Sequence, residues 1–120
     1  MKKQELGKIG EDIAVEMLIE KGYEILERNW RFRHNEVDII ARKDDLLVIA
    51  EVKTRSGDTY GEPYTAVDYR KQRYLIFAAE RYLYSHKLDL EVRFDIISIT
   101  RGQNRQVVEH IPEAFHPIAR

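Results

Sequence analysis

The chain has 120 residues and a mass of 14.3 kDa, which predicts a single domain over 1–120 and leaves little room for a second. Its 20 Lys and Arg against 21 Asp and Glu give a formal net charge of −1, and 43% of its residues are hydrophobic. This composition excludes wholesale disorder, collagen and coiled coils, and it argues against a protein that coats nucleic acid indiscriminately.

The absence of cysteine excludes a disulfide scaffold, a thiolate zinc site and a cysteine nucleophile. The first residues contain no apolar signal core, and no apolar run is long enough for a membrane span. We therefore expect a cytoplasmic protein that does not contact a membrane.

Hydrophobic periodicity predicts a helix over 3–21 that ends at Gly22. Its apolar stripe recurs at steps of three and four residues and consists of Leu6, Ile9, Ile13 and Met17, widened by Ala14 and Leu18. Alternating apolar residues then predict strands over 23–33, 36–42 and 46–54. We expect turns at His34-Asn35, because Asn tolerates the left-handed conformation, and at 43–45.

A loop with two glycines and a proline is predicted over 56–63, followed by a second helix over 66–86. The apolar face of this helix consists of Val67, Leu75, Ala78 and Tyr82. Strands over 91–100 and 106–111 close the chain as a hairpin. The order is α-β-β-β-α-β-β. Because strands cluster before the second helix, the predicted fold class is α/β with a mixed sheet, and not a doubly wound parallel one.

The hairpin around 44–45 brings two acidic residues together. A two-residue turn there pairs Ile40 with Ile49 and Asp38 with Glu51. Directly opposed residues have Cβ atoms about 4.5–5.5 Å apart, and like charges at that spacing destabilise a sheet. The two carboxylates therefore need a cation between them, a shared proton or solvent.

Three features favour the cation. The segments EVDII and LLVIAEVK are strongly apolar around the acids, which indicates interior strands where unpaired charges are costly. Carboxylate oxygens suit Mg²⁺, with Mn²⁺ as a substitute, better than zinc. Lys53 lies on the face of Glu51 and supplies an ammonium that could orient or deprotonate a water or neutralise developing charge. Together these groups suit phosphodiester hydrolysis. On spacing alone, the alternative is a structural ion pair of Lys53 with Asp38 or Glu51.

Gly7 and Gly10 lie inside the predicted first helix, where each costs about 1 kcal/mol relative to Ala. Both fall on or beside the apolar stripe, with Glu11 next to them. Their missing side chains would let the helix approach the sheet and bring Glu11 toward the acidic strands. The alternative for Glu11 is a solvated residue at the edge of the helix.

Three segments resemble the YraN-type family of uncharacterised bacterial proteins: Gly7-x-x-Gly10-Glu11, NEVDIIA over 35–41 and EVKTR over 51–55. The similarity runs nearly end to end and also includes Gly61-Glu62-Pro63, Ala66-Val67, Lys71-Gln72 and Arg93-Phe94-Asp95. That family resembles the PD-(D/E)xK nucleases, with the archaeal Holliday-junction resolvases as its closest well-understood relatives. The chain departs from the family at Asn35, where Gly is usual, although Asn still permits a positive φ.

The resemblance implies a restriction-endonuclease-like core, in agreement with the element order predicted from periodicity. It also implies that Asp38 and Glu51 bind the metal ion, that Lys53 is catalytic and that Glu11 supports catalysis.

Several residues near the predicted site have two interpretations. Glu36 faces Lys53 across the hairpin and is either another acid of the site or, as we favour, a salt-bridge partner. Lys71 and Gln72 lie on the apolar side of the second helix. Either Lys71 extends to solvent, or both residues reach over the site toward a phosphate as in related nucleases. Asp95, in an apolar strand, is expected to have a structural or hydrogen-bonding role.

Basic and aromatic residues alternate over 28–34 and over 69–74. Such stretches can hold phosphates and stack on unpaired bases. For the first stretch we favour the alternative, in which Trp30 and Phe32 pack in the core and the arginines are solvated. The four histidines show no metal-ligand spacing: His34, His86, His110 and His116.

These features predict an Mg²⁺-dependent endonuclease-like protein that hydrolyses DNA, with branched DNA as a candidate substrate. The residues expected to bind the nucleic acid are Arg55, Arg70, Lys71, Gln72 and Arg73. Because the chain is small and nearly neutral, a homodimer or a protein partner is a candidate source of further substrate contacts. The alternatives are a non-catalytic nucleic-acid-binding module of the same fold and an interaction protein whose acidic pair is only structural.

Overall fold

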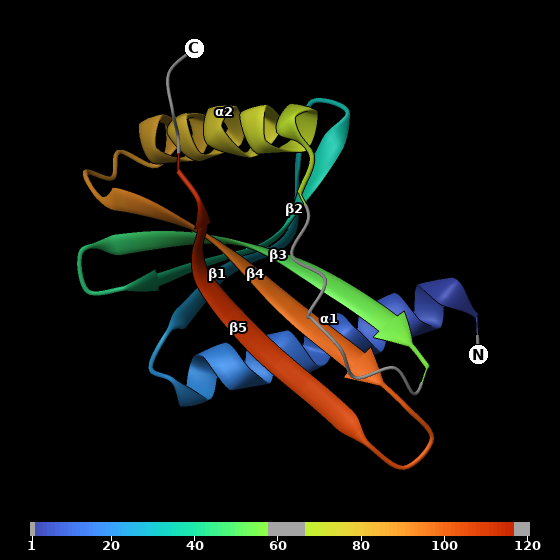
Figure 1. The fold of residues 1–120 in the computed structure, drawn as a ribbon. Helices are drawn as coiled ribbons and strands as arrows, with labels where there is room; N and C mark the ends of the chain where they lie inside the picture. Colours follow the sequence, from blue (N-terminus) through green and yellow to red (C-terminus); the bar gives the residue numbers. More distant parts are fainter. Residues whose placement is uncertain (1, 58–66, 117–120) are drawn as a thin grey trace.

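The computed structural model describes residues 2–57 and 67–116 (Figure 1). The elements are α1 (Lys3–Glu20), β1 (Glu24–Phe32), β2 (Asn35–Lys43), β3 (Leu46–Ser56), α2 (Tyr69–Ser85), β4 (Glu91–Arg101) and β5 (Gln106–Phe115). This confirms the predicted order α-β-β-β-α-β-β. Most of the predicted loop, including Gly61-Glu62-Pro63, and the predicted start of the second helix at Ala66 lie outside the described residues.

The five strands form one mixed sheet in the order β1-β2-β3-β4-β5. Strands β3 and β4 are parallel, and every other neighbouring pair is antiparallel. The chain between β3 and β4 passes through α2, because parallel neighbours need a long crossover. Helices α1 and α2 cover opposite faces of the sheet (Figure 1). Neither helix, over the part of the chain that is described, is long and apolar enough to cross a membrane.

Each helix buries its own hydrophobic cluster against the sheet. The apolar face predicted for α2 is confirmed, since Leu75, Ala78 and Tyr82 are buried together with Val67 just before the helix. On α1 the buried line consists of Gly10, Ala14 and Leu18. The prediction that Ile13 and Met17 lie at the centre of the buried face of α1 is wrong, because both are only partly buried. The helix turns its small residues toward the sheet, which lets the two backbones approach.

The close approach of α1 to the sheet occurs at Gly10. A Cβ atom built there would lie 2.0 Å from Oγ1 of Thr54 on β3, so only glycine fits without a shift. The prediction that Gly7 also allows a close approach of α1 to the sheet is wrong, because a Cβ at that position would meet nothing within 4 Å.

The hairpin register around Asp44 and Asp45 follows the prediction, with Ile40 opposite Ile49. The turn between β1 and β2 lies one residue earlier than expected. It is formed by Arg33 and His34, and Arg33, not Asn35, has the positive φ of 61°. Asn35 pairs with Phe32 as the first residue of β2, which leaves the two residues between them to turn the chain.

Two boundaries differ from prediction by three residues or more. Helix α2 begins at Tyr69 because the side chain of Asp68 accepts a hydrogen bond from the N–H of Lys71 and caps the helix. Strand β5 continues past Ile111 to Phe115, where its ring stacks on Phe94 of β4.

Candidate active site

Asp38 of β2 and Glu51 of β3 lie side by side where the two strands stop pairing. The last paired residues before them are Ile39 and Ala50. Beyond this pair, the N–H of Val52 donates to Oδ2 of Asp38 at 2.8 Å, and the N–H of Asp38 donates to Oε2 of Glu51 at 3.4 Å. The carboxylates thus take the place of main-chain carbonyls, and each is oriented by the backbone of the neighbouring strand.

Strand β2 is irregular at Asp38. Alternate residues of a regular strand point to the same face of the sheet. Here Val37 belongs to the cluster under α2, Ile39 belongs to the cluster under α1, and Asp38 lies between them. This change of face occurs where β2 leaves β3, and it places the carboxylate of Asp38 at the opening between the strands.

Both acids are shielded from solvent, and their pKa values are shifted in the same direction. Burial raises the pKa of Asp38, although the hydrogen bond from Val52 opposes the shift. Burial, followed by the negative charge of Asp38, raises the pKa of Glu51 to about 7. The positive charges of Lys71 and Lys53 act in the opposite direction on both acids. The pair therefore favours a shared proton or an added cation over two bare carboxylates.

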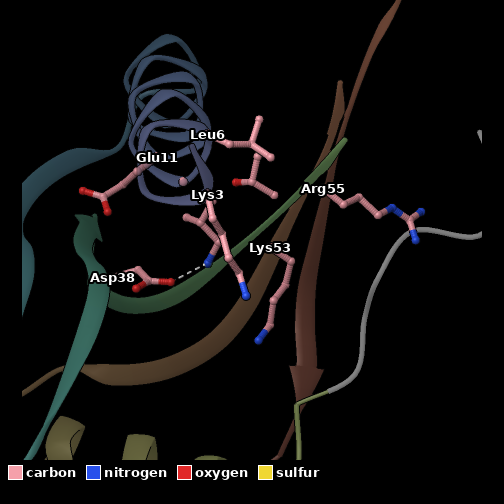
Figure 2. A pocket seen from close by; sticks show the side chains of 9 residues that line it. Lys3, Leu6, Glu11, Asp38, Lys53 and Arg55 are labelled. Carbon is pink, nitrogen blue, oxygen red and sulfur yellow. Dashed lines mark hydrogen bonds between the residues drawn. The ribbon is translucent and has the colours of Figure 1, made fainter. Parts of the chain in front are cut away.

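A cavity of about 550 Å³ opens between α1 and β3 beside Asp38. Glu11 lines it from α1, and Lys53 and Arg55 line it from β3, with the side chain of Arg55 extending away from the acids (Figure 2). The structure thus brings together Glu11, Asp38 and Lys53, as predicted. Glu51 does not line this cavity, because its side chain, only 6% exposed, lies beside Lys71 of α2.

Glu11 is not a freely solvated helix-edge residue, since only 13% of its side chain is exposed. Its Oε1 accepts hydrogen bonds from Nδ2 of Asn29 at 2.8 Å and from Nε of Arg28 at 3.1 Å. Asn29 has a φ of 51°, a conformation that Asn tolerates better than most residues. Both partners lie on β1, so this strand holds the Glu11 carboxylate near Asp38, where its charge contributes to the raised pKa of that acid.

Lys71 does not extend into solvent but reaches the acidic pair. Its Nζ lies 3.5 Å from Oε1 of Glu51 and donates to Oδ1 of Asn35 and to the carbonyl oxygen of Glu36, both at 3.1 Å. Gln72 does not accompany it, because its side chain donates to the carbonyl oxygen of Val67. Of the two residues, only Lys71 therefore contacts the acidic pair in this structure, and a contact of either with a phosphate stays a prediction.

The other predicted residues are distributed over separate contacts. Glu36 forms an ion pair with Arg31 on β1 at 2.8 Å, which replaces the expected pairing across to Lys53. Nε of Arg55 donates to Oγ1 of Thr100. Arg70 lines a second cavity of about 410 Å³ together with Lys71. Arg73 contacts Tyr69 on the outer side of α2, away from the acids.

The basic and aromatic stretch of β1 is mainly structural, as favoured from the sequence. Trp30 stacks on Phe32 and meets Tyr82 edge-on, which places both rings under α2. Between them in sequence, Arg31 is engaged by Glu36. Arg33 lies over the rings of Phe32 and Phe77.

Asp95 belongs to a different cluster, on β4. Arg93 donates to it twice at 2.8 Å, His110 lies 2.7 Å away, and the N–H of Glu113 donates at 3.2 Å. Burial would raise the pKa of Asp95, but the hydrogen bonds from His110 and Arg93 outweigh it and lower the pKa. Both oxygens of Asp95 thus accept hydrogen bonds from protein groups, which agrees with the structural or hydrogen-bonding role expected from the sequence.

The donor set at the acidic pair fits a hard cation in part. Asp38 and Glu51 supply oxygen donors whose repulsion a divalent ion would relieve. Among residues 2–57 and 67–116, however, no three His, Asp or Glu side chains gather closely enough to hold a metal ion. Mg²⁺ commonly binds through one or two carboxylates and keeps several waters.

Among the contacts of the site that were not predicted are the hydrogen bonds of Arg28 and Asn29 to Glu11, and that of Lys71 to Asn35. Each joins two different elements, so no local spacing indicated them. The sequence feature that comes closest to predicting them is the alternation of apolar and polar residues, which places polar side chains of β1 next to the acidic segment of β2.

The fold and the placement of the acids define an α/β domain with a restriction-endonuclease-like core. The chain belongs to the uncharacterised protein family UPF0102, whose family model matches residues 10–99, and the resemblance to the YraN-type family is thereby confirmed. A UPF0102 protein of Flavobacterium psychrophilum is 48% identical over 93% of this chain and 94% of its own length. Relatives from Bacteroides thetaiotaomicron and Myxococcus xanthus are 47% and 42% identical, each over 94% of this chain and over 93% and 90% of their own lengths.

Proposed function

We propose that the protein is a metal-dependent endonuclease-like enzyme that hydrolyses phosphodiesters of DNA, with Asp38 and Glu51 as ligands of Mg²⁺. The observation that carries this proposal is the buried acidic pair beside Lys53 at the edge of a cavity. Without a cation or a proton, two adjacent carboxylates in this position repel each other. A bound metal ion would polarise the scissile phosphate and neutralise charge that develops in the transition state.

The residues of the chain have distinct roles in this proposal. Asp38 and Glu51 orient their carboxylates through main-chain hydrogen bonds, so little ordering is required when a cation binds. Lys53 lines the cavity, and its ammonium could donate to a phosphate oxygen or orient the attacking water. Glu11, fixed by Arg28 and Asn29, can accept a hydrogen bond from that water.

The test is to measure DNA cleavage and DNA binding together on duplex, single-stranded and four-way substrates, with and without Mg²⁺. The proposal expects cleavage of at least one substrate by the wild-type protein with Mg²⁺. It expects no cleavage by Asp38→Asn, whose binding is preserved or tighter because a negative charge near the phosphate is removed. If the protein binds none of the three substrates, the proposal is refuted, and the remaining interpretation is an interaction protein whose acidic pair is only structural.

A second candidate is a nucleic-acid-binding module that does not cleave. The contact of Lys71 with Glu51 at 3.5 Å favours it, because the protein already supplies one cation to the acidic pair. Binding of DNA without cleavage of any substrate, in a protein that also binds Mn²⁺, would support this candidate. The molar mass of the protein with and without DNA would test whether a homodimer forms on the substrate.

A further inference from the structure

The side of α1 that faces the cavity carries a lysine, a glycine and a glutamate, one turn of the helix apart. Lys3, Gly7 and Glu11 follow one another at intervals of four residues, so they lie on the same side of the helix. All three line the cavity that Asp38 and Lys53 also line, and Figure 2 shows Lys3 and Glu11 on the helix. The absence of a side chain at Gly7 leaves helix backbone exposed between the ammonium and the carboxylate.

No packing requirement of the fold explains this glycine. Gly10 is required by its contact with Thr54, and Gly22 has a φ of +92° that disfavours other residues. A Cβ at Gly7, by contrast, would meet nothing within 4 Å, and the residue is exposed within regular helix. Glycine is the least favourable residue for a helix interior apart from proline. A glycine at a helix position where no contact of the fold requires it suits a surface that a ligand backbone approaches closely.

The charges around Gly7 indicate what kind of ligand approaches. Lys3 lines the cavity from α1 and Lys53 lines it from β3, so lysines border the cavity from two elements (Figure 2). The acids Glu11 and Asp38 line the same cavity, and Asp38 is one of the two metal ligands in the proposed function. A polyanionic strand that reaches the acids must therefore pass between these cations and across Gly7.

We propose that α1 forms one wall of the DNA-binding groove, with the sugar-phosphate backbone packed directly against Gly7 and Lys3 contacting a phosphate that flanks the reacting one. This inference rests on the proposed function and adds to it a binding surface and the position of the substrate strand.

The experiment measures binding of fluorescein-labelled duplex, single-stranded and four-way DNA by anisotropy, in an Asp38→Asn background that does not cleave. Gly7→Gln should weaken binding about tenfold, since a long side chain fills the groove, and Gly7→Ala should weaken it less. The melting temperature of both variants should be higher than that of the parent by about 2–5 °C, because each replaces a helical glycine. A Glu16→Gln change on the same helix, away from the cavity, is the matched control and should leave binding unchanged.

Lys3→Ala should lower the slope of log affinity against log salt by about one unit, because one phosphate contact is lost. Lys8→Ala, which removes an exposed lysine of α1 that does not line the cavity, is its control. If the parent binds DNA and Gly7→Gln binds equally well, the groove wall is refuted and the proposed function stands. If the parent binds none of the three DNAs, the proposed function itself fails. The melting temperatures show that lost binding does not arise from lost folding.

Discussion

The N–H of Val52 donates to Oδ2 of Asp38 at 2.8 Å, and this bond closes the gap where β2 and β3 stop pairing. A main-chain donor satisfies one oxygen of a carboxylate that burial would otherwise penalise. The N–H of Asp38 in turn donates a longer hydrogen bond, of 3.4 Å, to Oε2 of Glu51. The two acids are therefore fixed by the strands themselves, which accounts for an acidic pair that persists in an apolar sheet.

The pH dependence of stability should reflect the pKa of Glu51, which is raised from 4.5 to about 7. Between these values the folded protein binds a proton that the unfolded chain has released, so stability falls as the pH rises through this window. The raised pKa of Asp38 contributes in the same direction. Denaturant midpoints measured across the window should fall in the wild type. Glu51→Gln should flatten the profile, and an equally steep profile in that variant would contradict this assignment.

Divalent metal should reverse this loss of stability. Mn²⁺ or Mg²⁺ should raise the melting temperature of the wild type, with about 2.7 kcal/mol of stabilisation at a concentration one hundred times Kd. Asp38→Asn should remove the metal-dependent rise and be as stable as the wild type without metal, or more stable, because the repulsion is gone. Calorimetric titration checks the binding itself. Asp44→Asn, the same change at the far turn of the hairpin, should respond to metal like the wild type.

Local pattern predicted the register of the hairpin from its turn to Ile39 and Ala50, but not the irregularity that ends the pairing before Asp38 and Glu51. The alternation of apolar residues and a two-residue turn at 44–45 determine which residues pair, and the observed pairing of Ile40 with Ile49 follows from them. The contact between Lys71 and Glu51 depends instead on how α2 packs on the sheet, and no local spacing encodes that packing.

The misplaced turn between β1 and β2 has a similar cause. Residue preference favours Asn35 for a positive φ, but the pairing of Phe32 with Asn35 leaves Arg33 to adopt it. The guanidinium of Arg33 lies over Phe32 and Phe77, and these contacts offset an unfavourable backbone conformation. Tertiary contacts thus outweigh the local preference.

Gly10→Ala should destabilise the protein by about 1–3 kcal/mol, the usual range for overpacking. The added Cβ would lie 2.0 Å from Oγ1, 2.8 Å from Cγ2 and 2.9 Å from Cβ of Thr54. Thr54→Ala removes the two nearest atoms and keeps the third, so the double variant should recover part of the loss. Chemical denaturation of the four proteins gives the coupling energy directly. Additive effects would show that the helix does not approach β3 at this point.

Lys53→Ala should lower any DNA cleavage by about 10²–10⁴-fold, the range associated with a lost proton-transfer group. Metal binding should survive, because the carboxylates remain. Single-turnover cleavage and the Mn²⁺-dependent melting shift are measured on the same preparation, with Lys43→Ala at the far end of β2 as the control. Loss of folding in Lys53→Ala would instead support a structural ion pair.

The last prediction separates the two interpretations of Lys71. The positive charge of Lys71 opposes the rise in the pKa of both acids, and its Nζ donates to Asn35. Lys71→Met therefore removes a positive charge from beside the acidic pair. We expect a loss of about 1–3 kcal/mol at a pH above 7, where Glu51 is ionised. The loss should be smaller below 4.5, where Glu51 carries a proton. Arg73→Met on the exposed side of α2 is the control and should change stability by no more than about 0.5 kcal/mol at either pH. A Lys71→Met loss that is equal on both sides of the window would mean that Lys71 contributes through packing and not through its charge on the acids.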